Sequence, residues 1–303
     1  MSHANQSLVD VETTSLAATR ETFTTEQDSC ASGRKPAKAG KDSRVVEQAV
    51  KLSIGMPVHN AMECTLRAID RVLEACRANG WVYELHVIDD NSDPESNTRL
   101  RERLCLVDGY YTLDTTQSLT PNPAPNLAFN VNWLLDQVAD DADYYLNLET
   151  DVFVNAGALH TLMTKLRDNV EVCMTFPKQI TLDRQRADFY FCQRGYLPVG
   201  SLPEDLSNDR YFSWTHMGCT LVRGEHARNR EIRVDERFKL FCSDQDYSLR
   251  LRQVTGGHIL YVASAHVMHA GHASSQEGML PNPDPECFAR VDSKWCDMLK
   301  EPA

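Results

Sequence analysis

The sequence predicts an α/β fold with a mostly parallel central sheet. Two observations carry this prediction. Apolar runs rich in β-branched residues alternate with amphipathic helical segments between residues 51 and 176. Acidic and amide side chains follow directly after these runs, as in DDNSD after residue 88 and ETD after residue 148. Because parallel strands end at the same edge of a sheet, polar groups gathered there are typical of a nucleotide-binding sheet.

Composition limits the class of protein. The chain has 303 residues, of which 42% are hydrophobic, enough for a large core. A formal net charge of −12 disfavours nucleic acid, acidic substrates and anionic membranes as partners. No apolar run approaches the roughly 20 residues of a membrane span, and the amino terminus lacks a basic-then-apolar leader. We therefore expect a cytoplasmic protein without an integral membrane segment.

The ten cysteines contain no CxxC pair. This spacing gives no support to a zinc ribbon or a thioredoxin-like motif. We expect reduced cysteines, several of them buried as small apolar side chains, rather than disulfides.

Both ends of the chain read differently from its middle. Residues 1–44 have almost no periodic apolar pattern and are expected to form a disordered extension. The folded domain is expected over residues 45–275. Residues 276–303 contain PNPDP and are expected to form an irregular tail.

The first strand is predicted at Lys51–Val58 and the second at Tyr83–Ile88. Between them, a stripe of apolar residues at helical spacing predicts a helix that ends near Gly80. Asn60 is the expected N-cap of that helix, since Glu63 stands three residues later, close to a capping-box pattern.

The alternation continues along the chain. It predicts a strand at residues 109–113, a helix at 127–138, a strand at 144–148, a helix at 156–167 and a strand at 170–176. From Pro177 to Asn208 the pattern breaks down, and we expect a substrate-facing region rather than core.

Regular structure is predicted again after this region. A strand is expected at Trp214–Val222, interrupted by Gly218 where another backbone approaches closely. A helix at 243–254 and a strand at 258–262 follow, and residues 265–275 are expected to form a histidine-rich loop.

The order of these motifs resembles glycosyltransferase family 2, whose members have the GT-A fold. The motifs are PVHN, DDNSDP, PNLAFNVN, ETD, DERF, SDQDYSLRLR and HAGHAS, and they cover residues 51–275. Within the family the pattern is most similar to rhamnosyltransferase-like members. The resemblance implies one Rossmann-like domain, with a nucleotide-sugar half at 45–155 and an acceptor-binding, catalytic half at 156–275.

The resemblance also implies a donor site. Asp90 would accept from the base or the ribose, and Asp89 would orient the turn. Ala128 stands where the family commonly has glycine, and its methyl group could crowd the donor. A strand exit, an acidic turn and a helix cap at Asn126 are the structural alternatives. The implied nucleotide-sugar-binding residues are Pro57, His59, Asn60, Asp89, Asp90, Asn126 and Glu149.

The ETD segment lies where the family places its DxD motif. The implied cofactor is Mn²⁺ or Mg²⁺, with Asp151 as the ligand and Glu149 bound through water or to the ribose. His269 would complete the metal site. A solvated loop is the alternative for each of these residues.

Asp244 would be the catalytic base by the same resemblance, although Ser243 replaces a frequent glutamate. The helix dipole favours its anion, and burial opposes this. Asp246 is a candidate for acceptor binding, or for an ion pair with Arg250 four residues later. Trp214 and His216 would cover the acceptor sugar, with an ordinary core tryptophan as the alternative.

The expected function is therefore metal-dependent, inverting transfer of a sugar from a UDP- or dTDP-sugar to a hydroxyl of a glycan, lipid-linked or protein acceptor. Two alternatives stay open. One is a sugar-phosphate nucleotidyltransferase, against which the absence of a Gly-rich phosphate loop near the first strand weighs. The other is a non-catalytic nucleotide-sugar-binding protein.

Overall fold

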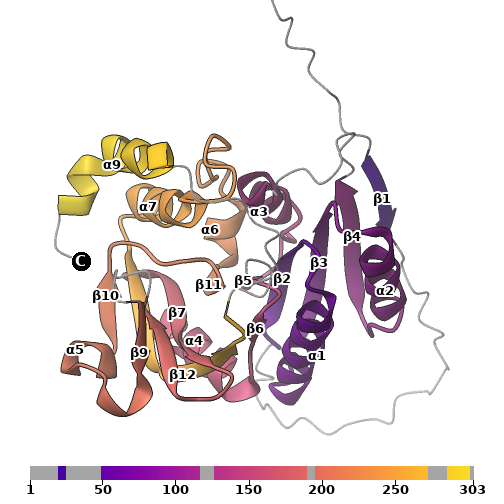
Figure 1. The fold of residues 1–303 in the computed structure, drawn as a ribbon, viewed down its shortest axis with the longest axis horizontal. Coiled ribbons are helices and arrows are strands. Elements are labelled where there is room, and N and C mark those ends of the chain that lie inside the picture. Colours follow the sequence, from indigo (N-terminus) through magenta and orange to yellow (C-terminus); the bar gives the residue numbers. More distant parts are fainter. Residues whose placement is uncertain (1–19, 25–48, 117–125, 190–194, 272–284, 301–303) are drawn as a thin grey trace, which may run out of the picture.

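The computed structural model describes residues 20–24, 49–116, 126–189, 195–271 and 285–300. These segments form a sheet with helices on both faces (Figure 1). In the described residues, no helix is long and apolar enough to cross a membrane. The strand β1 (Arg20–Thr24) pairs with β4 and falls within the segment that we expected to be disordered. The rest of that segment, up to residue 44, lies outside the described residues.

The central sheet is mostly parallel, as predicted. Its order is β1-β4-β3-β2-β5-β11-β7-β12-β10. The strands that share one direction are β2 (Lys51–Val58), β3 (Val82–Asp90), β4 (Tyr110–Thr116), β5 (Tyr144–Leu148), β7 (Val172–Thr181) and β12 (His258–His269). Those that run against them are β1, β10 (Arg210–Phe212) and β11 (Cys219–Arg223).

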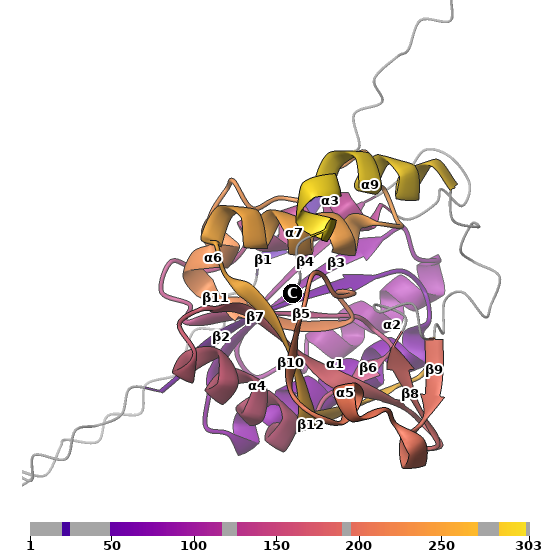
Figure 2. The ribbon, with the colours of Figure 1, turned by 90° about the vertical axis from the view of Figure 1, so that its left-hand side faces the viewer.

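Helices cover both faces of this sheet, because parallel strands are apolar on both sides. One face carries α1 (Met62–Ala78), α2 (Pro94–Leu104) and α4 (Ala156–Asp168). The other carries α3 (Leu127–Asp136), α6 (Gly224–Arg228) and α7 (Ser243–Thr255). A further helix, α9 (Pro285–Lys300), lies over α7 in both views (Figures 1 and 2). Residues 285–300 are thus helical, and the expected irregular tail is wrong there.

The start of α1 differs from the prediction. Ala61 is the N-cap, and both Asn60 and Ala61 have left-handed backbone conformations, with φ of 51° and 48°. Instead of capping α1, the side chain of Asn60 accepts from the backbone N–H of Asp93 over 2.9 Å. Its own N–H donates to Ser92 Oγ over 2.8 Å. Asn60 therefore ties the exit of β2 to the turn after β3.

Part of the region from Pro177 to Asn208, where the sequence pattern breaks down, forms regular structure with buried residues. Strand β7 extends to Thr181, and the chain returns antiparallel as β8 (Arg186–Phe189). Phe189 and Leu206 are fully buried. The elements that follow β8 are β9 (Gly195–Pro198), η2 (Val199–Ser201) and α5 (Glu204–Ser207).

The strands after this region also have different bounds. Strand β11 begins at Cys219 rather than Trp214, and β12 continues to His269 instead of ending at Val262. An irregularity between Val262 and His266 lets β12 stay paired with β7. Residues 265–269 are thus strand, not the expected loop, and part of the predicted loop, 272–275, lies outside the described residues.

Candidate active site

The turn that carries Glu149 and Asp151 is fixed by two neighbouring strands. It connects β5 to the short strand β6 (Val152–Phe153), which pairs with the end of β12. The backbone N–H of Glu149 donates to the carbonyl of Gly218 over 2.9 Å, and Ala270 N–H donates to the carbonyl of Asp151 over 2.8 Å. This close approach of the backbone occurs at the predicted glycine. The two acidic residues are therefore held at the carboxyl end of β5.

His269 lies between two carboxylates. Its Nε2 atom is 3.4 Å from Asp151 Oδ2, and its Nδ1 atom is 3.3 Å from Asp188 Oδ2. All three side chains are buried. Asp188 comes from β8, a strand that we did not predict. The apolar alternation of Ala187 and Phe189 around it is the pattern that could have revealed both the strand and this inward carboxylate.

Burial and like charge shift the pKa values in this cluster. Burial, and next the charge of Asp151, raise the pKa of Glu149 to about 8, while His269 opposes this. The charges of Asp244 and Asp188 also act on Glu149. Burial alone would lower the pKa of His269, but Asp151 and Asp188 raise it to about 10. The structure thus brings together Asp151 and His269, the two predicted metal ligands.

The chemistry of the donor set fits a hard cation. Asp151 Oδ2 and His269 Nε2 are separated by 3.4 Å, close to the spacing of about 3 Å between adjacent ligands around Mg²⁺. Within the described ranges, no group of three or more His, Cys, Asp or Glu side chains could hold a metal ion. A cation here would take its remaining ligands from water and a diphosphate, which Mg²⁺ accepts readily.

Asp244 is half-buried in the first turn of α7. Burial raises the pKa of its carboxyl to about 6, against the hydrogen bond that it accepts from the Gln245 N–H. Burial therefore outweighs the helix terminus in setting the basicity of this group. The N-cap, Cys242, has a φ of 66° and makes no side-chain cap.

Asp90 joins the end of β3 to the start of α3. Its Oδ2 accepts from the N–H of Asn126 over 2.6 Å and from Nδ2 of Asn130 over 2.7 Å. His59 Nδ1 donates to the Asp90 carbonyl over 2.7 Å. Asn130 is a member of this group that we did not predict. These contacts place the predicted donor residues His59, Asp90 and Asn126 side by side.

Other residues of the predicted donor site have structural contacts. Asp89 accepts from the Ser92 N–H over 3.1 Å and from the side-chain amide of Asn97. Asn126 caps α3, since its Oδ1 accepts from the Phe129 N–H over 3.2 Å. Pro57 is a half-buried residue of β2, opposite Ile88.

Ala128, which the sequence comparison predicted to crowd the donor, lies within α3. Ala128 is fully buried and packs in the core between α3 and the sheet. Its N–H donates to the carbonyl of Lys239 over 3.0 Å. The methyl group is accommodated by the core.

Two of the three predicted acceptor residues, Trp214 and His216, are partly exposed. Trp214 and His216 are both half-buried in the irregular stretch before β11. Trp214 packs against the apolar clusters under α7 and α9. His216 lies beside Gly218, where an added Cβ would be 3.1 Å from its Nδ1. Trp214 therefore has a core role whether or not its exposed part meets a sugar.

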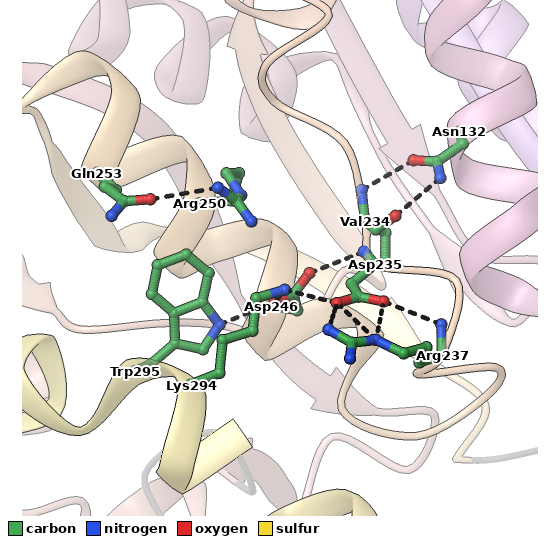
Figure 3. Close-up of polar contacts among 9 residues, drawn as sticks. All are labelled: Asn132, Val234, Asp235, Arg237, Asp246, Arg250, Gln253, Lys294 and Trp295. Atoms are coloured by element: carbon green, nitrogen blue, oxygen red, sulfur yellow. Dashed lines mark hydrogen bonds and ion pairs between the residues drawn. The ribbon is translucent and has the colours of Figure 1, made fainter. Parts of the chain in front are cut away.

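Asp246 does not lie where we expected. It is fully buried, and Lys294 Nζ is 2.6 Å from its Oδ1 (Figure 3). It also accepts from Trp295 Nε1 and from the Asp235 N–H, each over 2.8 Å. The predicted pair with Arg250 is wrong, because Arg250 donates to Gln253 and its guanidinium lies 5.1 Å from the Trp295 ring centroid. A carboxylate that faces α9 is also unavailable to an acceptor.

Comparison with solved structures defines the class of fold. No protein-family model matches the chain, and no curated protein matches its sequence. The fold is that of the GT-A glycosyltransferases, as predicted.

The structures that match include those of two proteins. Residues 1–349 of S. aureus TarS match with a TM-score of 0.55 and 14% identity, over 82% of this chain and 65% of that one. The same fragment in complex with UDP matches with a TM-score of 0.52 and 14% identity, over 80% and 63%. GalNAc-T7 crystallised with UDP, GalNAc and Mn²⁺ matches with a TM-score of 0.58 and 16% identity, over 84% and 49%. The chain thus spans less than two thirds of each of these structures.

Proposed function

We propose that the protein is a cation-dependent, inverting glycosyltransferase that moves a sugar from a UDP- or dTDP-sugar to an acceptor hydroxyl. One observation carries the proposal: in a GT-A fold, the buried side chains of Asp151 and His269, with Oδ2 and Nε2 3.4 Å apart, lie at the carboxyl ends of β5 and β12. Membership of family 2, similarity to rhamnosyltransferase-like members and a cytoplasmic location remain expectations from the sequence.

The donor half of the site would begin at Asp90. Two donors hold its Oδ2 at the carboxyl end of β3, the position at which carboxylates of nucleotide-binding sheets meet a ribose or base. His59 is attached to the same residue through its carbonyl. UDP in the TarS and GalNAc-T7 structures supports a nucleoside diphosphate as part of the donor.

Asp151 and His269 would hold the cation, and the Mn²⁺ in the GalNAc-T7 structure supports this choice of cofactor. When bound, such a cation supplies Lewis-acid stabilisation of the departing diphosphate. Glu149 lies next to these ligands and would bind a cation-bound water or the ribose. Its raised pKa, about 8, falls when a positive charge is placed nearby.

Asp244 would remove the proton from the acceptor hydroxyl as that oxygen attacks the anomeric carbon. A pKa of about 6 leaves the carboxylate ionised at pH 7, yet makes it a stronger base than an ordinary aspartate. General-base catalysis of this kind contributes roughly 10²- to 10⁴-fold to the rate. Attack from the face opposite the diphosphate inverts the configuration.

The test begins with binding. Nucleotide sugars are screened by thermal shift with Mn²⁺, since a ligand of the native state raises the melting temperature. The best donor is then incubated with the protein, and released nucleoside diphosphate is measured. We expect release in the wild type and its loss in Asp244→Asn. Release of pyrophosphate from a sugar phosphate and a nucleotide would identify a nucleotidyltransferase, and binding without any turnover would identify a non-catalytic binder.

A further inference from the structure

Asp188 is a buried carboxylate that the proposed chemistry does not use. It pairs with Gln179 of β7 in the hairpin formed by β7 and β8, while His269 pairs with Thr181 of the same strand. Side chains from β8 and β12 thus meet across β7, with Asp188 Oδ2 3.3 Å from His269 Nδ1. Asp188 is only 3% exposed. A carboxylate at such a depth is costly unless a positive or hydrogen-bonding group compensates it.

His269 presents its two ring nitrogens to different partners. Nε2 faces Asp151, and Nδ1 faces Asp188. Nδ1 is shielded from water, so a proton at that atom needs an acceptor within the protein. A neutral imidazole carries its proton on one nitrogen and its lone pair on the other. Both nitrogens face a carboxylate, so the choice of tautomer depends on the cation: one that takes the lone pair of Nε2 leaves the proton on Nδ1, where Asp188 can accept it.

We propose that Asp188 is a positioning residue for the cation site: it accepts the Nδ1–H of His269 and so directs the Nε2 lone pair toward Asp151 and a divalent cation between them. The proposal rests on the cation dependence proposed above. Histidine ligands commonly donate their second N–H to a carboxylate, which fixes the ring and increases its basicity as a ligand. Loss of such a partner typically weakens metal binding 10- to 100-fold.

The competing explanation is an ordinary buried ion pair that holds β8 against β12. The two explanations differ in what Asp188 does for the cation. Asp188→Asn keeps the size of the side chain but removes its charge and lets the amide present either an acceptor or a donor. A structural pair predicts lower stability with unchanged cation affinity. A positioning role predicts weaker cation binding in protein that is still folded.

The experiment measures the Kd of Mn²⁺ in the presence of UDP, from the electron paramagnetic resonance signal of free Mn²⁺. We expect Asp188→Asn to raise this Kd by about 10- to 100-fold. The matched control is Asp183→Asn, an exposed residue at the turn of the same hairpin, which should leave the Kd unchanged. The melting temperature of each cation-free variant is recorded beside it.

A second measurement needs no variant. Nitrogen-15 NMR of the wild type with Mg²⁺ and UDP should show His269 protonated at Nδ1 and unprotonated at Nε2. The opposite tautomer overturns the proposal, as does an unchanged Mn²⁺ Kd in Asp188→Asn, even if that variant melts earlier. A wild type that binds no Mn²⁺ with UDP contradicts the cation dependence itself, which is a different failure.

Discussion

The indole N–H of Trp295 donates to the carboxylate of Asp246 over 2.8 Å and thereby joins α9 to α7, the helix that carries Asp244 (Figure 3). Lys294 and the Asp235 N–H complete the contacts of this carboxylate. A buried carboxylate is stable only with such a full set of partners. The position of the proposed base therefore depends on a helix that lies outside residues 51–275, the range over which the sequence resembles family 2.

Trp295→Phe should destabilise the protein. It keeps a ring in the apolar cluster but removes one donor to a fully buried carboxylate, at a cost of about 1–3 kcal/mol. For a protein of this size that lowers the melting temperature by roughly 2–12 °C. Differential scanning calorimetry measures the shift. Phe288→Ala, on an exposed part of α9, is the control and should change little; equal melting of Trp295→Phe and wild type would contradict the prediction.

The contacts between α9 and the start of α7 should weaken in acid, because Lys294 of α9 also pairs with Asp235 over 3.0 Å. The hydrogen bond from Arg237 lowers the pKa of Asp235, burial opposes this, and Lys294 lowers the pKa further. Because the folded pKa lies well below the unfolded value of about 3.8, the stabilisation is complete above about pH 5, declines as the pH falls below 3.8, and is lost only when the pH falls through the folded pKa. The difference in melting temperature between wild type and Asp235→Asn should be largest and constant above about pH 5, and should shrink steadily as the pH falls below about 4. A difference that does not shrink in acid would refute this.

Asp244→Asn should lower the rate of transfer by about 10²- to 10⁴-fold with little change in donor affinity. The amide cannot take the proton of the acceptor, whereas the diphosphate site is left intact. Donor consumption and isothermal titration with UDP give the two quantities. Glu225→Gln removes the charge of an exposed carboxylate, 71% accessible, and should have wild-type activity. Undiminished turnover in Asp244→Asn would remove this residue from the chemistry.

The pH dependence of wild-type turnover should reflect the raised pKa of Asp244, about 6. A general base acts in its deprotonated form, so activity is present above about pH 6 and is lost below it. The acid limb of kcat/KM locates this midpoint. A midpoint near the ordinary aspartate value of about 4 would show that burial does not set the basicity of the working group.

Asp151→Ala should make donor binding insensitive to Mn²⁺. One of the two proposed ligands is lost, so UDP affinity measured with Mn²⁺ should fall by roughly tenfold or more. Removal of metal from the wild type by EDTA should give the same affinity as the variant. If Asp151→Ala kept a Mn²⁺-dependent gain in UDP affinity, the cation would have to be held elsewhere.

Much of the fold could be predicted from short sequence patterns. Strands β2 and β5 have the predicted bounds, since a short apolar run fixes a buried strand by itself. Helix α2 was missed although Asp93 caps it, because only Leu100 and Leu104 are buried on it. Two buried residues give too weak a period to recognise.

The misplaced residues have partners that are distant in sequence. Helical spacing predicts an ion pair between Asp246 and Arg250, one turn away, but Asp246 accepts a hydrogen bond from Trp295 of another helix instead. Asp188 lies in β8, a strand defined by its pairing with β7 rather than by its own composition. Helical spacing gives the neighbours that a residue could have, and tertiary packing selects among them. The catalytic and binding roles themselves stay predictions.

The contacts between α7 and α9 also limit the order in which the protein can fold during its synthesis. Trp295 follows Asp246 by 49 residues, so α7 emerges from the ribosome well before the groups that compensate its buried carboxylate. Until residues 294 and 295 are available, burying Asp246 would leave a charge without its cation and its indole donor. The helix that carries the proposed base can therefore complete its packing only after residues 294 and 295 have been made, later than the parallel strands β2 to β5.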